Sequence, residues 1–322
     1  MQLFQQGAPS SPYASAINAL NTHIQTRMKK PWLWPRFLYT LTPTGKDFYK
    51  NLDTVRNFTI DVINKNIARR KSEKERGSIE IETGIDFEGN KRRRPKVFLD
   101  TLLDLFDAGE IDIEGIQEEV DTFMFESHDT TATGLSWTLY ELGRRPDIQD
   151  KLHAELLKVD PELGIVDKVK SVKYLDYVLK EGLRLHPPVP IYARVIDADT
   201  VVDGNVVPKG TNFPVFAYML HRNPMYWEDP DTFNPDRFGE EEFSKRNPYV
   251  YVPFSAGSRN CVGQKFALLE EKIMLYYLVL NYRFASTQKE EEVQDCFEVI
   301  HKSENGLQMT LEARETVNKR II

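Results

Sequence analysis

A lone cysteine occurs where a glycine-containing loop is expected to enter a helix, in the string FSAGSRNCVGQKFA at residues 254–267. A thiol at a helix start lies near unpaired backbone N–H groups and the positive end of the helix dipole, and both favour the thiolate. Arg259, two residues before Cys261, adds positive charge. Gly257 permits a left-handed turn, and Gly263 lets a flat partner approach the backbone. The segment therefore predicts a thiolate ligand for a soft metal.

Cys261 has three interpretations. Phe254 can shield its sulfur, and haem iron takes a dry, hydrogen-bonded thiolate as a ligand. A buried inert cysteine is a second interpretation, but the full F-x-x-G-x-R-x-C-x-G string makes it unfavourable. A thiol-dependent hydrolase is a third, but no adjacent histidine is present to activate the thiol.

The string resembles the haem-binding signature of the cytochrome P-450 enzymes, which are haem-thiolate monooxygenases. The resemblance implies that the cofactor is haem b and that Cys261 is the axial ligand of its iron. It also implies that four neighbours shape the cofactor site: Phe254, Gly257, Arg259 and Gly263. Arg194, in VPIYAR, matches a family position that pairs with a haem propionate.

Two further segments contain charged residues that could form a buried ion cluster. The motif E-G-L-R at residues 181–184 places a carboxylate and a guanidinium three residues apart, and FNPDRF supplies Arg237. A pair at this spacing is commonly a surface salt bridge, but apolar neighbours surround this one. The segments resemble the E-x-x-R helix and second-arginine segment of the same family. The resemblance implies that Glu181, Arg184 and Arg237 hold the loop leading to Cys261 and are structural to the haem site.

A proline-free stretch over residues 112–145 predicts one long helix, with Asp112 as its N-cap and Gly143 followed by Pro146 as its stop. Thirty helical residues rise about 45 Å, so we expect the helix to be buried through its middle. Its centre, ESHDTT at residues 126–131, is nevertheless polar, and burial of polar groups is costly unless they are paired.

That centre resembles the oxygen-activating stretch of the family, usually written A/G-G-x-D/E-T-T. The resemblance implies that Thr130 and Asp129 are catalytic and deliver protons, which oxygen cleavage requires in a water-poor pocket. The alternative is a helix whose threonines bond their own backbone. Ser127 stands where the pattern has glycine, and it could bend the helix by bonding the carbonyl of Phe123.

The longer string VDTFMFESHDTT resembles family four of the superfamily, the fatty-acid-hydroxylating branch. In many members of that branch the glutamate matching Glu126 forms an ester with a haem methyl. Glu126 has no Lys or Arg within four residues on either side. An unpaired buried carboxylate is expected to be protonated or consumed in a bond, which is consistent with such an ester.

Other segments suggest the surrounding architecture. Mixed three- and four-residue apolar spacings predict helices over residues 13–70, which the resemblance places over the substrate site. The prolines of residues 31–43 break these helices at an aromatic corner, either buried or facing lipid or substrate. Residues 69–96 are rich in charge and are expected to form a surface loop.

The second half of the chain adds helices over residues 147–156 and 174–186, the latter carrying the E-x-x-R motif. Asp203-Gly204 predicts a hairpin, and residues 254–280 are expected to form the cysteine loop and a helix that starts at Cys261. The predicted fold class is mainly α with small β sheets, as in the later part of the cytochrome P-450 fold. We expect a single partial domain over residues 1–322.

Composition limits the function classes. The chain has 322 residues and a net charge of −7, so nucleic-acid binding is not expected. Two cysteines exclude a disulfide framework, and Cys296 matches nothing in the haem signature. The six histidines show no short pair spacing such as H-x-x-x-H, so no zinc site is expected from sequence. Neither a signal peptide nor a membrane span is expected.

Matched to the family, the chain begins partway in and is expected to be N-terminally truncated. The expected function is O2-dependent hydroxylation of a lipophilic substrate, a fatty acid or related lipid, at or near its chain terminus. The resemblance implies an NADPH-dependent cytochrome reductase and cytochrome b5 as partners, and the cytoplasmic face of the endoplasmic reticulum membrane as the location of the full-length protein. The alternative is a catalytically inactive remnant that binds haem weakly or not at all.

Overall fold

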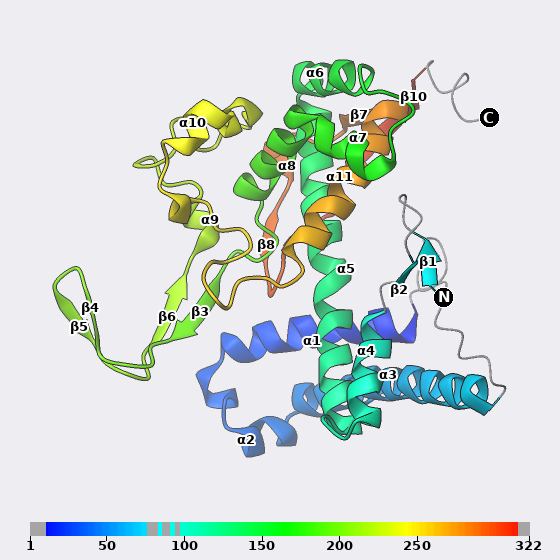
Figure 1. Ribbon diagram of the computed structural model, residues 1–322. Coiled ribbons are helices and arrows are strands. Elements are labelled where there is room, and N and C mark those ends of the chain that lie inside the picture. The colour runs from blue at the N-terminus through cyan, green and yellow to red at the C-terminus, as the bar shows by residue number, and fades with distance from the viewer. Residues whose placement is uncertain (1–10, 76–82, 86–90, 94–96, 315–322) are drawn as a thin grey trace. The chain divides into compact units, whose positions relative to one another are not determined.

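The computed structural model describes residues 11–75, 83–85, 91–93 and 97–314, which form two compact units (Figure 1). The first unit ends at Glu126 and the second begins at Ser127. Helix α5 (Ile113–Arg144) contains this division, and each of its halves belongs to one unit. No helix among the described residues is long and apolar enough to cross a membrane.

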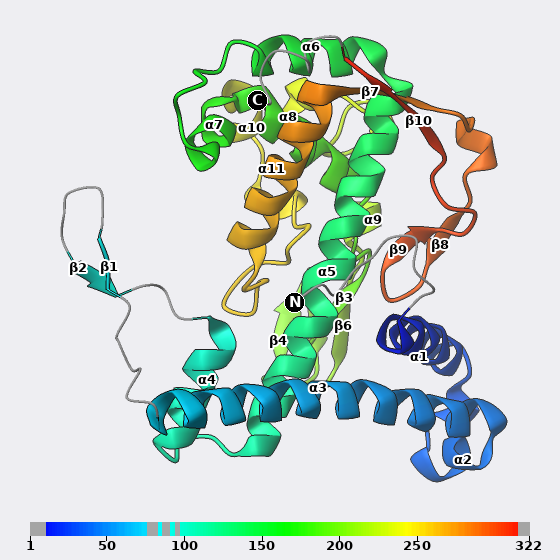
Figure 2. The same ribbon diagram turned by 90° about the vertical axis from the view of Figure 1, so that its right-hand side faces the viewer.

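Two long helices dominate the first unit, and α1 packs on α3 through a shared apolar cluster (Figure 2). Ser11 caps α1 by accepting a hydrogen bond from the amide of Ala14 at 3.2 Å. The elements of this unit before α5 are α1 (Pro12–Met28), η1 (Pro31–Leu33), α2 (Arg36–Leu41), α3 (Pro43–Glu75), β1 (Thr83–Ile85), β2 (Lys91–Arg93) and α4 (Phe98–Asp107). The helices expected over residues 13–70 are therefore confirmed.

The aromatic corner between α1 and α3 is exposed, so the buried interpretation was wrong. Trp32, Trp34 and Phe37 expose 65%, 60% and 68% of their surface. The corner is fixed by polar bonds, since the Arg27 guanidinium donates to the carbonyl of Trp34 at 2.6 Å and the Trp34 indole donates to the carbonyl of Arg27 at 3.1 Å. The interpretation as a face for lipid or substrate stays a prediction.

The expectation of a surface loop over residues 69–96 was wrong at its start, because residues 69–75 continue α3. Ion pairs between residues one turn apart stabilise the later part of α3. Asp61 and Lys65 pair one turn apart at 2.5 Å, and Arg69 pairs with Glu73 at 3.5 Å. Strands β1 and β2 pair antiparallel further along, and residues 76–82, 86–90 and 94–96 lie outside the described residues.

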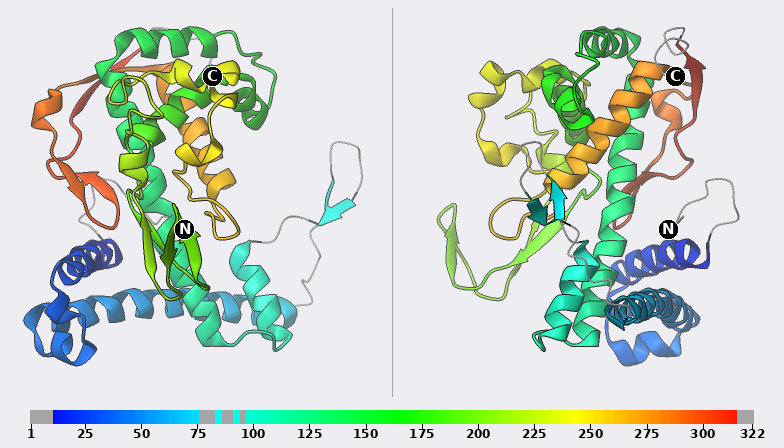
Figure 3. Two further views of the ribbon diagram at one scale, coloured as in Figure 1. Left: turned by 90° about the vertical axis from the view of Figure 1, so that its left-hand side faces the viewer. Right: turned by 45° about the vertical axis from the view of Figure 1, so that its right-hand side comes forward.

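The second unit consists of helices around a large apolar cluster and a smaller one, together with small antiparallel sheets (Figure 3). Its helices after α5 are α6 (Pro146–Leu156), α7 (Ile165–Ser171), α8 (Lys173–Leu185), α9 (Ala217–Leu220), η2 (Pro235–Phe238), α10 (Glu240–Ser244), η3 (Pro248–Val250), α11 (Gln264–Asn281) and η4 (Glu290–Glu292). Its strand pairs are β3 (Tyr192–Val195) with β6 (Asn212–Val215), β4 (Thr200–Val202) with β5 (Asn205–Val207), β7 (Tyr282–Ser286) with β10 (Met309–Ala313), and β8 (Asp295–Phe297) with β9 (His301–Ser303).

The residues of the turn between β4 and β5 explain why this small sheet forms. The hairpin expected at Asp203-Gly204 is confirmed, because both residues adopt positive φ angles of 47° and 77° between β4 and β5. Such a pair of left-handed residues suits the right-handed twist of a two-residue hairpin. The mainly α fold class with small sheets is likewise confirmed.

The long helix is confirmed as α5, but its polar centre is not buried. Asp112 caps it by accepting a hydrogen bond from the amide of Gly115 at 2.8 Å, and Pro146 opens the next helix. Glu126 and Ser127 are exposed. The helix continues through Ser127 without a break. The argument that Glu126 is a buried carboxylate was therefore wrong.

Tight packing positions α8 in the second unit. A Cβ added at Gly182 would lie 2.1 Å from the hydroxyl oxygen of Thr138 on α5, so only glycine permits this approach. Leu175, Val178 and Leu179 of α8 are fully buried. This packing holds α8 in place, and α8 carries the charged residues Glu181 and Arg184 of the candidate site.

Candidate active site

The E-x-x-R motif forms a buried, forked ion pair on α8. Arg184 donates from Nε to Glu181 Oε2 at 2.6 Å and from Nη2 to Oε1 at 2.8 Å, and both side chains are fully buried. Bidentate pairs of this kind are among the strongest hydrogen bonds in proteins. The pair is therefore part of the interior and not a surface salt bridge.

Arg237 joins the pair from η2, as expected. Its Nε lies 3.4 Å from Glu181 Oε1, and the amide of Asn234 donates to the same oxygen at 2.8 Å. Burial raises the pKa of the Glu181 carboxyl, whereas Arg184, Asn234 and Arg237 counteract the shift. The sequence prediction that two guanidiniums surround one carboxylate is confirmed.

The cluster also holds a stretch of irregular backbone. Arg184 Nη1 donates to the carbonyls of His221 at 2.8 Å and Pro230 at 2.6 Å. Arg237 Nη2 donates to the carbonyl of Asp229 at 2.7 Å. Carbonyls in an irregular segment lack partners in secondary structure, and here charged donors satisfy them.

His221 extends this network toward the cysteine, although sequence analysis did not single it out. Its Nε2 accepts a hydrogen bond from the amide of Val252 at 2.9 Å, two residues before Phe254. Burial, together with the neighbouring Arg184 charge, lowers the pKa of the His221 imidazole to about 3. The imidazole is therefore neutral, and its acceptor nitrogen fixes the start of the cysteine loop.

The cysteine loop is a tight reversal of the chain. The amide of Cys261 donates to the carbonyl of Phe254 at 3.0 Å. Ser255 and Gly257 both have left-handed backbone, with φ angles of 61° and 82°. The expected left-handed turn at Gly257 is confirmed. The expected helix start was wrong, because α11 begins at Gln264.

Arg194, from β3, ties the cysteine loop to the neighbouring sheet. Its Nη2 donates to the hydroxyl of Ser255 at 2.7 Å and to the carbonyl of Arg259 at 3.0 Å. The guanidinium is half-buried beside the loop. A cation at this point could meet an acidic group of a bound cofactor while it also supports the loop.

On α5, the acidic residue of the polar centre is paired. Asp129 Oδ2 accepts a hydrogen bond from Lys302 of β9 at 2.8 Å. Thr130 is half-buried, and the hydroxyl of Thr131 donates to the carbonyl of Ser127 at 3.3 Å. The backbone-bonded threonine weighed as an alternative therefore describes Thr131.

Comparison with known proteins identifies the family. A model described as Cytochrome P450 matches residues 3–311 of the chain. The chain belongs to the cytochrome P450 family. It is 40% identical over 319 residues to cytochrome P450 4V2 of Mus musculus, covering 96% of this chain and 59% of that protein. It is 35% identical over 320 residues to cytochrome P450 4c3 of Drosophila melanogaster, covering 98% of this chain and 60% of that protein.

The fold of this cytochrome P450 chain agrees with solved structures. A crystal structure of the cytochrome P450DA heme domain superposes with a TM-score of 0.71 at 24% identity, covering 95% of this chain and 62% of that chain. The chain thus spans about three fifths of the length of the relatives that it matches. The expected cytochrome P-450 fold, mainly α with small sheets, is confirmed.

The residues of this cytochrome P450 around Cys261 fit the haem that the family implies. Cys261 is exposed, so its sulfur is accessible to a ligand. Val262, the next residue, and Phe266, in the first turn of α11, expose 79% and 70% of their surface, an apolar area that is costly to leave in water and that an apolar ring would cover. With the cation of Arg194 at the same loop, the chain offers an accessible sulfur ligand, an apolar face and a partner for carboxylates.

Proposed function

We propose that this chain is the thiolate-bearing part of a haem-thiolate monooxygenase that hydroxylates a lipophilic substrate. Haem b, held by the sulfur of Cys261, would supply the activation of O2. The observation that carries the proposal is the exposed thiol at the end of a loop whose other end is fixed by His221 and the buried Glu181–Arg184–Arg237 cluster. A loop fixed in this way keeps the sulfur at one position.

The chain's own groups support proton delivery. The Thr130 hydroxyl would donate a proton toward the reaction centre and regain one from its neighbour, the Asp129 carboxyl. Lys302 Nζ, 2.8 Å from Asp129 Oδ2, would return a proton to that carboxylate, and its partly exposed ammonium would regain one from solvent. We propose Thr130 and Asp129 as the catalytic pair on this basis and on the family resemblance.

A fatty acid or related lipid, hydroxylated at or near its terminus, is the proposed substrate class. The support is the string VDTFMFESHDTT, which resembles the fatty-acid-hydroxylating branch, together with the similarity to proteins named cytochrome P450 4V2 and cytochrome P450 4c3. An NADPH-dependent reductase, with cytochrome b5, would supply the electrons. We propose the cytoplasmic face of the endoplasmic reticulum membrane as the location of the full-length protein.

An ester between Glu126 and a haem methyl is proposed from the resemblance alone, since Glu126 is exposed. The test is acid–acetone extraction after turnover of the full-length protein. Haem should stay with the polypeptide and become extractable in Glu126→Ala, while Glu119→Ala, an exposed glutamate on the same helix, should retain it. Complete extraction from the active wild type would rule out the ester.

The activity is tested by loading the chain with haem and adding reductase, NADPH and a medium-length fatty acid. Mass spectrometry should find a product heavier by one oxygen, labelled when 18O2 is the gas. Thr130→Ala should lower the yield and raise the fraction of electrons lost to peroxide. Haem loading without any labelled product, in both this chain and its full-length form, would contradict the monooxygenase.

A further inference from the structure

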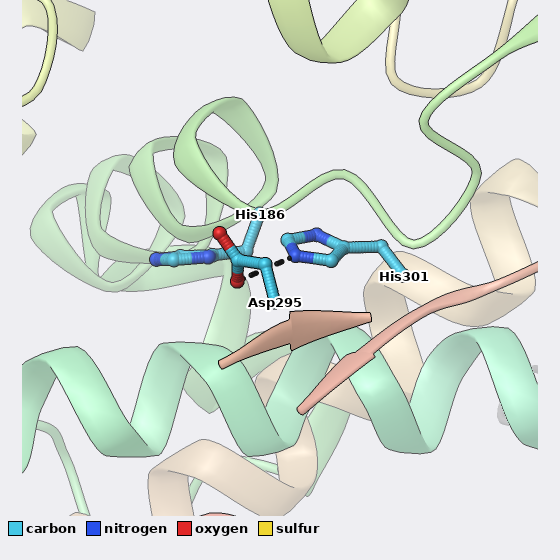
Figure 4. Close-up of side chains that lie close together, drawn as sticks. All are labelled: His186, Asp295 and His301. Carbon is cyan, nitrogen blue, oxygen red and sulfur yellow. Dashed lines mark hydrogen bonds and ion pairs between the residues drawn. The ribbon is translucent and has the colours of Figure 1, made fainter. Parts of the chain in front are cut away.

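A cluster of metal-ligating side chains lies in the second unit, outside the proposed haem site (Figure 4). Asp295 and His301 come from the paired strands β8 and β9, and His186 follows the last residue of α8. One donor atom from each residue lies within 4.8 Å of the other two. The chain thus places two imidazoles and one carboxylate at one point.

Each histidine of the cluster uses Nε2 in a hydrogen bond and leaves its other ring nitrogen, Nδ1, without one. His301 Nε2 lies 2.9 Å from Asp295 Oδ1, and His186 Nε2 lies 3.0 Å from Glu141 Oε1. His186 and His301 expose only 8% and 0% of their surface, yet Nδ1 of each is buried without a hydrogen-bond partner. A buried ring nitrogen without a hydrogen bond destabilises the fold, and a metal ion can take the lone pair of Nδ1 of His186.

The surroundings of His186 match those of histidines that bind a metal. A metal-bound histidine usually bonds its other ring nitrogen to a carboxylate, which fixes its tautomer and its orientation. Glu141 provides that carboxylate and is itself held by Arg144 at 3.6 Å. Trp137 stacks on the His186 ring at 4.2 Å and donates from its indole to the carbonyl of His301 at 3.2 Å. Both imidazoles are therefore held in place before any ion arrives.

The three ligand atoms need to move only slightly to reach the separations found around a zinc ion. With bonds of about 2.0–2.1 Å, the ligand atoms of tetrahedral zinc lie roughly 3.3 Å apart. The present separations run from 2.9 Å to at most 4.8 Å. Asp295 can move because its side chain is 34% exposed, and this exposure leaves room for water as a fourth ligand.

We propose that His186, Asp295 and His301 form a binding site for a divalent zinc-type cation, distinct from the haem site. Imidazole and carboxylate ligands in this number suit zinc among the transition metals. The ion would fasten the β8–β9 hairpin to the end of α8, two segments far apart in sequence. Sequence analysis expected no zinc site because the two histidines are not close neighbours along the chain.

The test is equilibrium dialysis of the haem-loaded chain against Zn²⁺, with Co²⁺ absorption as a report on the ligands. We expect one zinc per chain and a tetrahedral Co²⁺ spectrum. Asp295→Asn, at a partly exposed position that should tolerate the change, should weaken binding at least about tenfold, and Glu141→Gln by about 10- to 100-fold. His301→Gln should abolish binding.

The matched control is His23→Gln, because His23 forms a comparable pair with Asp47 at 2.7 Å in the first unit. It should leave zinc binding unchanged. The absence of stoichiometric zinc, or equal binding by wild type and Asp295→Asn, would overturn the site. A Co²⁺ spectrum with a thiolate charge-transfer band that disappears in Cys261→Ser or Cys296→Ser would assign the ion to a cysteine instead.

Discussion

The imidazole of His221 accepts a hydrogen bond from the amide of Val252 at 2.9 Å, while the carbonyl of the same histidine accepts one from Arg184 at 2.8 Å. One residue thereby connects the buried ion cluster of α8 to the loop that carries Cys261. The connection needs a neutral imidazole, because a protonated ring has no acceptor nitrogen. The cysteine loop should therefore be sensitive to acid.

Acid should destabilise the folded chain through protonation of His221. Burial lowers the pKa of His221 from 6.5 to about 3, so between these values the unfolded chain binds a proton that the folded chain does not. Stability from this group is complete above pH 6.5 and falls by about 1.4 kcal/mol per pH unit toward pH 3. His221→Gln, which keeps an acceptor oxygen, should remove this slope in chemical denaturation. An identical acid slope in both proteins would contradict the role of His221.

Glu271 of α11 should give the opposite sign of pH dependence, because its contribution to stability falls as pH rises. It is 2% exposed, and burial raises the pKa of its carboxyl from 4.5 to about 8. The folded chain then retains a proton that the unfolded chain has lost, so this contribution to stability is complete below pH 4.5 and is lost as pH rises toward 8. Glu271→Gln should flatten the fall in stability between pH 4.5 and 8, and Glu270→Gln, which removes only a neighbouring charge that adds to the shift, should flatten it less. Equal slopes in the two variants would show that Glu271 is not the responsible group.

The ion cluster should be far more costly to break than a surface pair. Removing Glu181 or Arg184 leaves an uncompensated buried charge, which typically costs about 3–5 kcal/mol. Glu181→Ala and Arg184→Ala should lower the free energy of unfolding by about that amount and should weaken haem retention. Glu240→Ala breaks the exposed pair with Lys173 and serves as the control. If all three variants melt together with wild type, the cluster does not stabilise the fold.

The contact between α8 and α5 should not tolerate a side chain. Gly182→Ala would place a methyl group 2.1 Å from the Thr138 hydroxyl oxygen, and overpacking of this kind costs about 1–3 kcal/mol. Gly164→Ala is a fair comparison, because its nearest neighbour would be 4.0 Å away and its φ angle is −62°. Thermal melts should separate the two variants by several degrees. Equal melting temperatures would mean that the helices can separate freely.

Local patterns in the sequence predicted the elements and the ion cluster well. Asp112, Pro146 and Asp203-Gly204 act through nearby backbone, and the structure confirms each of them. The E-x-x-R cluster was predictable because the motif and its family resemblance specify all three members. Burial of the α5 centre was predicted from helix length alone, which says nothing about what covers a helix.

The remaining features depend on contacts between distant segments. Nothing near His221 in the sequence indicates that its ring reaches Val252. In the same way, His186 and His301 are brought together only when the β8–β9 hairpin returns to α8. Spacing rules for metal sites detect ligands on one turn or one helix, and they miss ligands assembled by tertiary structure.

The central claim is that Cys261 ligates haem through its thiolate. The most direct measurement is the reduced carbon-monoxide difference spectrum of the haem-loaded chain, compared with Cys261→Ser and with Cys296→Ser as the matched thiol control. The account predicts the thiolate-type band in wild type and in Cys296→Ser, and its loss in Cys261→Ser even where some haem stays bound. The same band in Cys261→Ser, or its absence from haem-loaded wild type, would contradict the account.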